Sequence, residues 1–219
     1  MDIFDLIGPI MVGPSSSHTA GAVRIGYVAR KIFREEPKKA EIILHGSFAA
    51  TGRGHGTDRA LVAGLLGMHP DDSRIPDSFE IAQDRGLDFS FESRQLRSAH
   101  PNTAKIKLWS ESGRELEITA ASVGGGRIEV RELAGMPMCF TADKPTLLIS
   151  NDDKPGSIAR VSEVLSREHI NIATFNVNRS SRGGRAIMVI ECDSPVSPEA
   201  LGHIADSPGI LTAAFIDLD

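Results

Sequence analysis

"TLLISNDDKPGSIARVSEVL", residues 146–165, changes from a strand-like to a helix-like pattern within one short segment. Aliphatic and β-branched residues at 146–150 predict a strand, and Pro155 and Gly156 predict the turn after it. From Ser157 onward, apolar side chains recur at helical spacing. The segment therefore predicts a strand, a turn and a helix in succession.

The sequence after this segment continues the alternation of strands and helices. Residues 173–178 alternate apolar and polar side chains, which predicts a half-buried strand, and residues 186–191 predict a buried strand. Proline within residues 194–205 favours the start of a short helix, and residues 210–218 predict a final strand. The order βαββαβ is that of a ferredoxin-like unit, which we place at residues 144–219.

The first part of the chain, residues 1–143, is predicted to form a less regular α+β domain. Helices are expected where apolar residues recur every three or four positions, and strands where short apolar runs end in turn residues. Residues 69–88 are mostly loop by composition. On these patterns we predict helices at 22–35 and 57–67, and strands at 40–45, 106–110, 115–120 and 124–131.

The composition is that of a globular protein with one large or two ordinary domains. The chain has 219 residues, of which 41% are hydrophobic and 24% charged, and its formal net charge is -5. Lys and Arg are scattered, whereas nucleic acid requires a concentrated basic face, so we expect no nucleic-acid partner. No apolar run approaches the length of a membrane span, and residues 1–11 lack a signal-peptide pattern, so we expect a cytoplasmic chain.

Two cysteines, Cys139 and Cys192, are far apart and form no CxxC pair. A structural zinc site or an all-cysteine iron–sulfur cluster cannot be built from them alone. We therefore predict no metal ligand in this chain.

The segment "GPSSSHTAGAVRIG", residues 13–26, places hydroxyl side chains and His18 just before a predicted helix. The first N–H groups of a helix are unpaired and attract anions, so a carboxylate or phosphate could bind there, with His18 to handle a proton. The simpler alternative is that Ser17 or Thr19 only caps the helix. The hydroxyl-bearing residues are Ser15, Ser16, Ser17 and Thr19.

Two further loops also contain a histidine. In "HGSFAATGRGHGTD", residues 45–58, glycines flank His55, and Thr57 and Asp58 suit the start of a helix. A structural turn with a solvent-facing histidine explains this segment equally well. "HPNT", residues 100–103, would alone be only a loop. Together, however, the three loops carry His18, His55 and His100, and histidine is suited to proton transfer.

Taken in order, GPSSSHT, TGRGHGTD, HPNT and SVGGG (residues 122–126) resemble the beta chain of two-subunit, iron–sulfur-dependent bacterial L-serine dehydratases. The resemblance covers essentially the whole chain. The region of residues 144–219 looks like an ACT domain, a regulatory module that commonly binds amino acids. Residues 1–143 also resemble the allosteric substrate-binding domain of some 3-phosphoglycerate dehydrogenases.

The resemblance implies that the chain is one subunit of an L-serine ammonia-lyase, which converts L-serine to pyruvate and ammonia. It implies a [4Fe-4S] cluster that is held by cysteines of a partner alpha chain, where an iron acts as Lewis acid on the β-hydroxyl. A homodimer is also expected. The alternative is a non-catalytic regulatory subunit that senses serine.

Carried onto this sequence, the resemblance implies roles for residues in each loop. His18 and His55 are candidates for proton transfer. Asp58 would orient a neighbouring group or cap the helix that begins there. Single-chain members often have two adjacent histidines where this chain has His55 and Gly56, so the identity of the base stays open. The residues expected to bind substrate are Ser15, Ser16, Ser17, Thr19, Gly46, Ser47, His100, Asn102 and Thr103.

In the ACT-like region, the loop after the first strand is where such domains usually hold an effector. Asn171 and Ile172 are expected to face that loop from the next strand. The alternative is a turn that only supports dimerisation through the sheet edge. The loop residues concerned are Asn151, Asp153, Pro155 and Gly156.

Overall fold

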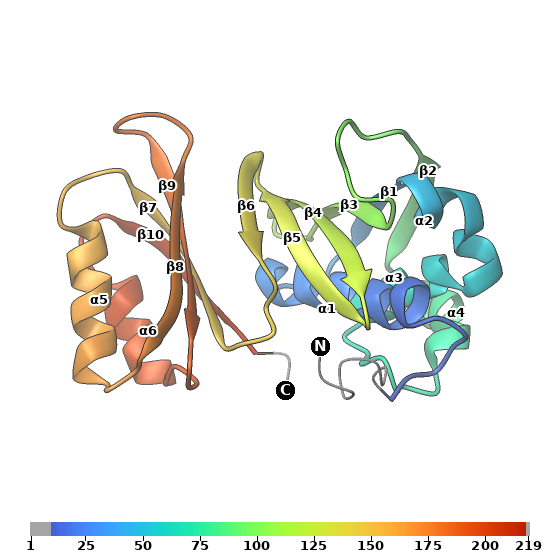
Figure 1. Cartoon of the computed structure of the whole chain (residues 1–219), viewed down its shortest axis with the longest axis horizontal. Helices are drawn as coiled ribbons and strands as arrows, with labels where there is room; N and C mark the ends of the chain where they lie inside the picture. The colour runs from blue at the N-terminus through green and yellow to red at the C-terminus, as the bar shows by residue number, and fades with distance from the viewer. Residues whose placement is uncertain (1–9, 218–219) are drawn as a thin grey trace. The chain divides into compact units, whose positions relative to one another are not determined.

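The computed structural model describes residues 10–217, which form two compact units (Figure 1). The first unit ends at Gly135 and the second begins at Met136. The domain boundary that the sequence predicts, between residues 143 and 144, stays a prediction. Every described helix is too short or too polar to span a lipid bilayer.

The first unit is built on a mixed sheet. Strand β1 pairs with β2 in parallel and with β3 antiparallel, and β3, β4 and β5 continue antiparallel in the order β2-β1-β3-β4-β5. A parallel pair needs a long crossover, and the helices between β1 and β2 provide it. The strands are β1 (Lys39–Leu44), β2 (Asp88–Ser93), β3 (Thr103–Trp109), β4 (Glu115–Gly124) and β5 (Arg127–Leu133).

Helices cover one face of this sheet. Helix α1 packs on α3 and on β4, and the alternation along β3 puts Ile106 and Leu108 into the core beneath it. The helical elements of the unit are the π turn Ser16–Ala20, α1 (Gly21–Phe33), α2 (Gly46–Thr51), the 3-10 turn Gly52–His55, α3 (Thr57–Leu65), the 3-10 turn Ile75–Asp77 and α4 (Ser78–Asp84).

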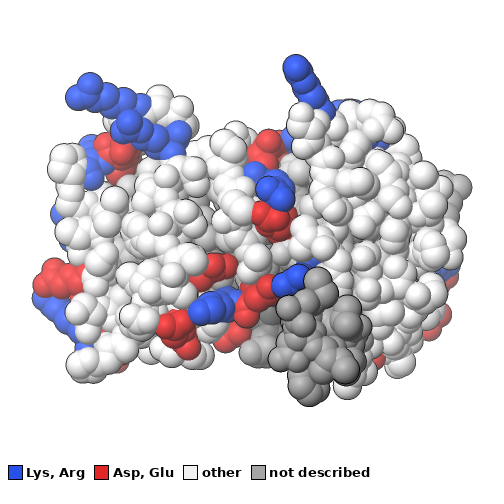
Figure 2. Space-filling view, in the orientation of Figure 1, with Lys and Arg blue, Asp and Glu red and all other residues white. Residues whose placement is uncertain are grey.

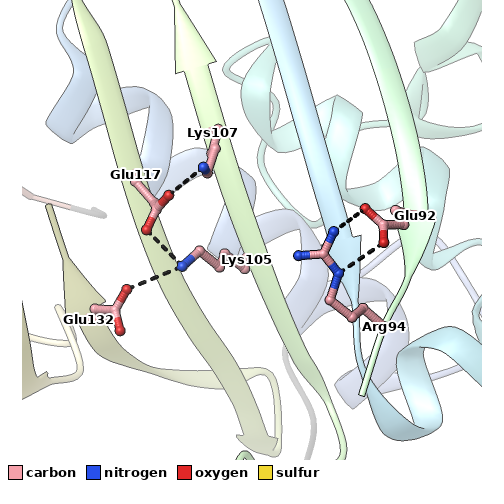
Figure 3. Close-up of polar contacts among 6 residues, drawn as sticks. All are labelled: Glu92, Arg94, Lys105, Lys107, Glu117 and Glu132. Carbon is pink, nitrogen blue, oxygen red and sulfur yellow. Dashed lines mark hydrogen bonds and ion pairs between the residues drawn. The ribbon is translucent and has the colours of Figure 1, made fainter. Parts of the chain in front are cut away.

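The opposite face of the sheet carries charged side chains. Lys105 on β3 contacts Glu117 on β4 at 2.7 Å and Glu132 on β5 at 3.4 Å, and Lys107 contacts Glu117 at 2.9 Å (Figure 3). The hydrogen bond that Lys105 donates to Glu117 is the main cause that raises the pKa of Lys105. Because these side chains are partly exposed, each pair contributes about 1 kcal/mol or less to stability. Burial on the helix-covered face stabilises the unit far more.

Helices α1 and α3 approach each other closely at two glycines. A Cβ atom on Gly26 would lie 2.3 Å from the carbonyl oxygen of Leu61, and one on Gly64 would lie 2.1 Å from that of Val23. Neither position has room for a side chain, so the helices cross backbone against backbone.

The second unit has the predicted ferredoxin-like order. Its four-stranded sheet runs β10-β7-β9-β8 with antiparallel neighbours. Two helices bury apolar residues such as Val161 and Ile204 against Leu147 and Met188 of the sheet. The elements are β6 (Met136–Phe140), β7 (Thr146–Asp152), α5 (Ser157–Arg167), β8 (Ile172–Arg179), β9 (Arg185–Cys192), α6 (Pro198–Ala205) and β10 (Ile210–Ile216).

The predicted elements are confirmed, with boundaries shifted by a few residues, wherever apolar periodicity was strong. The prediction of mostly loop at 69–88 is wrong, because this segment contains a 3-10 turn and α4. The buried positions of α4 are the small residues Ser78 and Ala82, which leave little apolar periodicity in the sequence. Strands β2 and β6 and helix α2 were also not predicted.

Acidic and basic side chains are interspersed over the face of the molecule that Figure 2 shows. That the chain binds no nucleic acid, whose phosphates attract a concentrated basic surface, stays a prediction from the sequence.

We predict that Gly64→Ala destabilises the first unit by at least about 2 kcal/mol, because the added methyl group overlaps backbone atoms of α1. Gly54→Ala is the control, since nothing lies within 4 Å of its Cβ position, and its effect should stay within about 0.5 kcal/mol. Denaturant unfolding followed by fluorescence of the single tryptophan, Trp109 on β3, measures both effects. Equal unfolding midpoints for the two variants would contradict the crossing geometry.

Candidate functional site

The segment before α1 begins with a cap and a π turn. Ser15 is extended, and its Oγ accepts a hydrogen bond of 3.1 Å from the backbone N–H of His18. The N–H of Gly21 then bonds to the carbonyl of Ser16, which closes the wider π-type ring. The simpler alternative, in which Ser17 or Thr19 provides the cap, is therefore wrong, because Ser15 occupies the extended position that capping requires.

The His18 ring is held among side chains of α2. Its Nε2 lies 3.0 Å from Ser47 Oγ and 3.2 Å from Thr51 Oγ1, and its edge packs on Phe48 with ring centroids 5.4 Å apart. Thr51 is a site residue that the sequence analysis missed. It follows Ser47 by one helical turn, so its i, i+4 spacing would have indicated it if α2 had been predicted.

His55 lies beside His18, with ring centroids 5.0 Å apart. The hydroxyl of Thr19 donates a hydrogen bond of 3.1 Å to the carbonyl of His55 and joins the two loops. Thr19 is only 2% exposed, and its single hydroxyl hydrogen is used in this bond. Thr19 therefore holds the loops together and has no hydrogen left for a substrate carboxylate, contrary to its expected binding role.

The pKa of His18 is lowered from its ordinary value. Burial is the largest cause, since it disfavours the charged imidazolium, and the like charge of His55 lowers the pKa further. A hydrogen bond with Ser47 opposes these effects only in part. The lowered pKa favours the neutral form of the His18 ring, which is the form that can accept a proton.

A glycine brings the loop of residues 100–103 against α2. Gly46 has φ of +57°, and a Cβ there would lie 2.6 Å from the carbonyl oxygen of Pro101. That carbonyl accepts a hydrogen bond of 2.8 Å from the N–H of Ser47. Only glycine combines this positive φ with so close an approach, so Gly46 shapes the site through its backbone.

Within this loop the expected binding residues differ in accessibility. His100 is exposed, and its Nδ1 accepts a hydrogen bond of 3.2 Å from the N–H of Asn102, which is half-buried. Thr103 is 2% exposed, and its hydroxyl donates to the carbonyl of His100 at 2.6 Å. Thr103 therefore has a structural contact where a substrate contact was expected. The N–H of Ser122 donates to the carbonyl of Asn102 at 2.9 Å, which places the "SVGGG" segment next to this loop.

The start of α3 differs from the expected cap. The N-cap position is Gly56 in the left-handed conformation, and the buried hydroxyl of Thr57 has no hydrogen-bond partner among the described residues. Asp58 lies in the first turn, where a carboxylate favours the helix dipole, and its Oδ1 accepts from the N–H of Arg59 at 2.9 Å. In the described structure no hydrogen bond joins Asp58 to His18 or His55, so an orienting role is not supported by its contacts.

In the second unit, the loop after β7 is tied together by polar contacts. Asn151 is 2% exposed, and its Oδ1 has no hydrogen-bond partner among the described residues. Asp153 accepts hydrogen bonds from the N–H of Gly183 at 2.9 Å and from Arg179 at 3.1 Å, which lower the pKa of its carboxyl. Pro155 and Gly156 form the exposed turn before α5.

The sheet register separates Asn171 and Ile172 from this loop. Ile172 pairs with Cys192, next to the start of β7, whereas Asp152 at the end of β7 pairs with Arg185. The expectation that these residues face the loop is therefore wrong within one chain, because β8 runs parallel to β7 and begins at the other end of the sheet.

The cysteines do not fit an iron–sulfur cluster. Neither Cys139 nor Cys192 forms a disulfide, and burial raises the pKa of the Cys192 thiol, which disfavours the thiolate that a metal requires. Among residues 10–217, no group of three or more His, Cys, Asp or Glu is placed to hold a metal ion.

Comparisons with known proteins assign the family. The family model "Serine dehydratase beta chain" matches residues 2–80, and the ACT domain model matches residues 145–213. The probable L-serine dehydratase beta chain of Bacillus subtilis is 44% identical over 98% of this chain and 97% of its own length. This chain belongs to the serine dehydratase beta chain family. A second member, the L-serine dehydratase beta chain of Peptoniphilus asaccharolyticus, is 38% identical with the same coverage.

The similarity extends beyond the serine dehydratase beta chain family. D-3-phosphoglycerate dehydrogenase of Bacillus subtilis is 26% identical over 90% of this chain, which matches 37% of the longer protein. This agrees with the resemblance seen in the sequence of the first part of the chain.

We predict that His55→Asn raises the pKa of His18, because it removes a like charge that disfavours the imidazolium. Titration of the His18 ring protons by NMR measures the shift. His203→Asn on α6 is the control and should leave the pKa of His18 unchanged. A pKa of His18 that stays the same or falls in His55→Asn would show that the charge of His55 does not lower it.

Proposed function

We propose that this chain is the beta subunit of an L-serine ammonia-lyase, which converts L-serine to pyruvate and ammonia together with an alpha chain. Membership of the serine dehydratase beta chain family supports the reaction. The observation that carries the proposal is the pair of histidines, 5.0 Å apart, beside a hydroxyl-lined turn at the start of α1. Serine loses its α-proton and β-hydroxyl, and the resulting aminoacrylate tautomerises and is hydrolysed.

In this proposal the carboxylate of serine binds at the turn before α1. Ser16 and Ser17 are half-buried there, and Ser15 adds a hydroxyl that already caps the turn. Unpaired N–H groups at a helix start favour a carboxylate. Ser47, with Asn102 and His100 on the adjacent loop, borders the same region through the Gly46–Pro101 contact.

His18 and His55 are the proposed proton-transfer groups. The lowered pKa of His18 favours the neutral ring, the form that a base for the α-proton requires. The nearby His55 makes a second proton on the pair unfavourable, so one of the two rings stays available to accept a proton. Asp58 has only its place at the start of α3 to support a role.

The electrophile belongs to the partner in this proposal. Because the described cysteines do not fit a cluster, we propose that the [4Fe-4S] cluster is held by the alpha chain. The beta chain then supplies substrate binding and proton transfer. Homodimerisation and a cytoplasmic location remain predictions from the sequence.

A regulatory role for the second unit is a second proposal. The unpartnered Oδ1 of Asn151 lies near the end of β7, just before the loop that leads to α5, and Arg160 on α5 has a buried Nε without a partner among the described residues. An amino-acid effector could satisfy both atoms, because it carries an ammonium donor and a carboxylate acceptor. Asp153, Pro155 and Gly156 complete this loop, whereas Asn171 and Ile172 are left out.

The alternative reading is a subunit that senses serine without catalysis. The similarity to a D-3-phosphoglycerate dehydrogenase favours the sensing role, because the name of that enzyme describes a different reaction. A sensor needs donors for a carboxylate but has no need of a neutral base. The contact between His18 and His55 therefore favours catalysis over sensing alone.

We predict that anaerobic pyruvate formation from L-serine requires both this chain and its cluster-bearing alpha chain. Each chain alone should be inactive, because binding groups and electrophile lie on different chains. Pyruvate release is measured for each chain and for the mixture. An alpha chain that is equally active without this chain would overturn the catalytic proposal and support serine sensing.

We predict that His55→Asn lowers kcat of the mixture by about 100-fold or more, the size of effect expected for a positioned proton-transfer group. The complex should still assemble, as size-exclusion chromatography with the alpha chain would show. His203→Asn, on α6 of the second unit, is the matched control for turnover. Near-normal turnover in His55→Asn would remove His55 from the mechanism.

A further inference from the structure

Three hydroxyl groups surround the His18 ring. Ser47 Oγ and Thr51 Oγ1 lie 3.0 Å and 3.2 Å from Nε2, and Ser15 Oγ lies 3.5 Å from Nδ1. A neutral imidazole has one N–H and one lone pair, so these contacts determine which nitrogen can accept a proton.

Thr51 has only a lone pair to offer His18. Its hydroxyl donates its single hydrogen to the carbonyl of Ser47, one turn earlier in α2, at 2.9 Å. While this shorter bond is made, the oxygen that faces Nε2 at 3.2 Å can only accept. If Nε2 carried a lone pair as well, two lone pairs would oppose each other at 3.2 Å.

Ser47 is compatible with either arrangement, because its hydroxyl can donate or accept. With hydrogen on Nε2, the oxygens of both Ser47 and Thr51 accept from one N–H. With hydrogen on Nδ1, Ser47 could donate to Nε2, but Thr51 would still repel it. Thr51 therefore decides between the two forms.

The hydrogen-bond contact of His18 Nδ1 is weak. Ser15 Oγ already accepts from the backbone N–H of His18, and its 3.5 Å distance from Nδ1 is long for a hydrogen bond. The Nδ1 lone pair is thus only loosely engaged. It also lies on the side of Ser15, the start of the turn where the carboxylate would bind, and the α-carbon of serine is one bond from that carboxylate.

We propose that Thr51 is a positioning residue that holds His18 with its hydrogen on Nε2, so that Nδ1 is the atom that takes up the proton. The proposal rests on the proposed function for the role of that proton. The hydrogen-bond assignment itself depends only on the contacts of this chain. Thr51 does not touch the substrate and acts through His18.

The ¹⁵N NMR spectrum of the full chain tests the assignment directly. Above the pKa of the ring, an unprotonated nitrogen resonates far downfield of a protonated one, and His18→Gln identifies the His18 signals by their loss. We expect the downfield signal on Nδ1 of His18. A downfield signal on Nε2 would overturn the proposal, whether or not the mixture with the alpha chain forms pyruvate.

Two substitutions separate the hydroxyl of Thr51 from its shape. Thr51→Val keeps the shape but removes the acceptor, so Ser47 can donate to Nε2 and the population should move toward hydrogen on Nδ1. Thr51→Ser keeps the hydroxyl and should restore the wild-type spectrum. An unchanged spectrum in Thr51→Val would show that Thr51 does not set the hydrogen position.

The same variants connect the assignment to turnover. In the mixture with the alpha chain, Thr51→Val should lower kcat by up to about 100-fold and leave KM nearly unchanged, because the base and not the binding turn is affected. An unchanged kcat together with a moved hydrogen would overturn Nδ1 as the proton acceptor. Absence of turnover in the wild-type mixture would instead overturn the proposed function.

Discussion

The crossing of α1 and α3 at Gly26 and Gly64 is the constraint on which the first unit depends. Each glycine lies against the backbone of the other helix, so the two helices have one way to fit together. Gly26 lies in the first half of α1, and Gly64 is the next-to-last residue of α3. The packing of the two helices fixes the elements that follow the segments carrying His18 and His55, and the hydrogen bond from Thr19 to the carbonyl of His55 joins those segments. The site therefore depends on helix packing in the core together with a contact between the loops.

Local pattern was enough to predict α1, α3 and the whole ferredoxin-like unit, because each of these elements has its own apolar periodicity. The sequence could not predict α2, which begins at a positive-φ glycine that is stabilised by contact with Pro101. Without α2, the place of Thr51 was also beyond prediction. The prediction for Asn171 and Ile172 was wrong because the start of β8 and the end of β7 lie at opposite ends of the sheet. Only the register of the strands shows this. The residue types of the site were predictable, whereas their partners required the tertiary structure.

Fewer hydroxyl groups of the site are available to donate a hydrogen bond to a ligand than their number suggests. A hydroxyl has one hydrogen to donate, and several of these hydrogens are already used inside the protein. Thr19 donates to His55, Thr103 donates to His100, and Thr51 donates to Ser47. The hydroxyl groups of a motif rich in serine and threonine can therefore bind a ligand or hold the loops together. The sequence alone did not reveal the second of these roles.

The π turn at Ser16–Ala20 makes the spacing of the motif as important as its composition. A π turn contains one residue more per hydrogen-bonded ring than an α turn. If a single residue were deleted and α1 became regular through this segment, the side chains before the deletion would rotate by about 100° around the helix axis. His18 would then point away from Ser47, even though every hydroxyl and both imidazoles were still present. We therefore expect insertions and deletions here to separate His18 from Ser47 while the motif keeps its residue types, so the length of this segment is constrained as much as its composition.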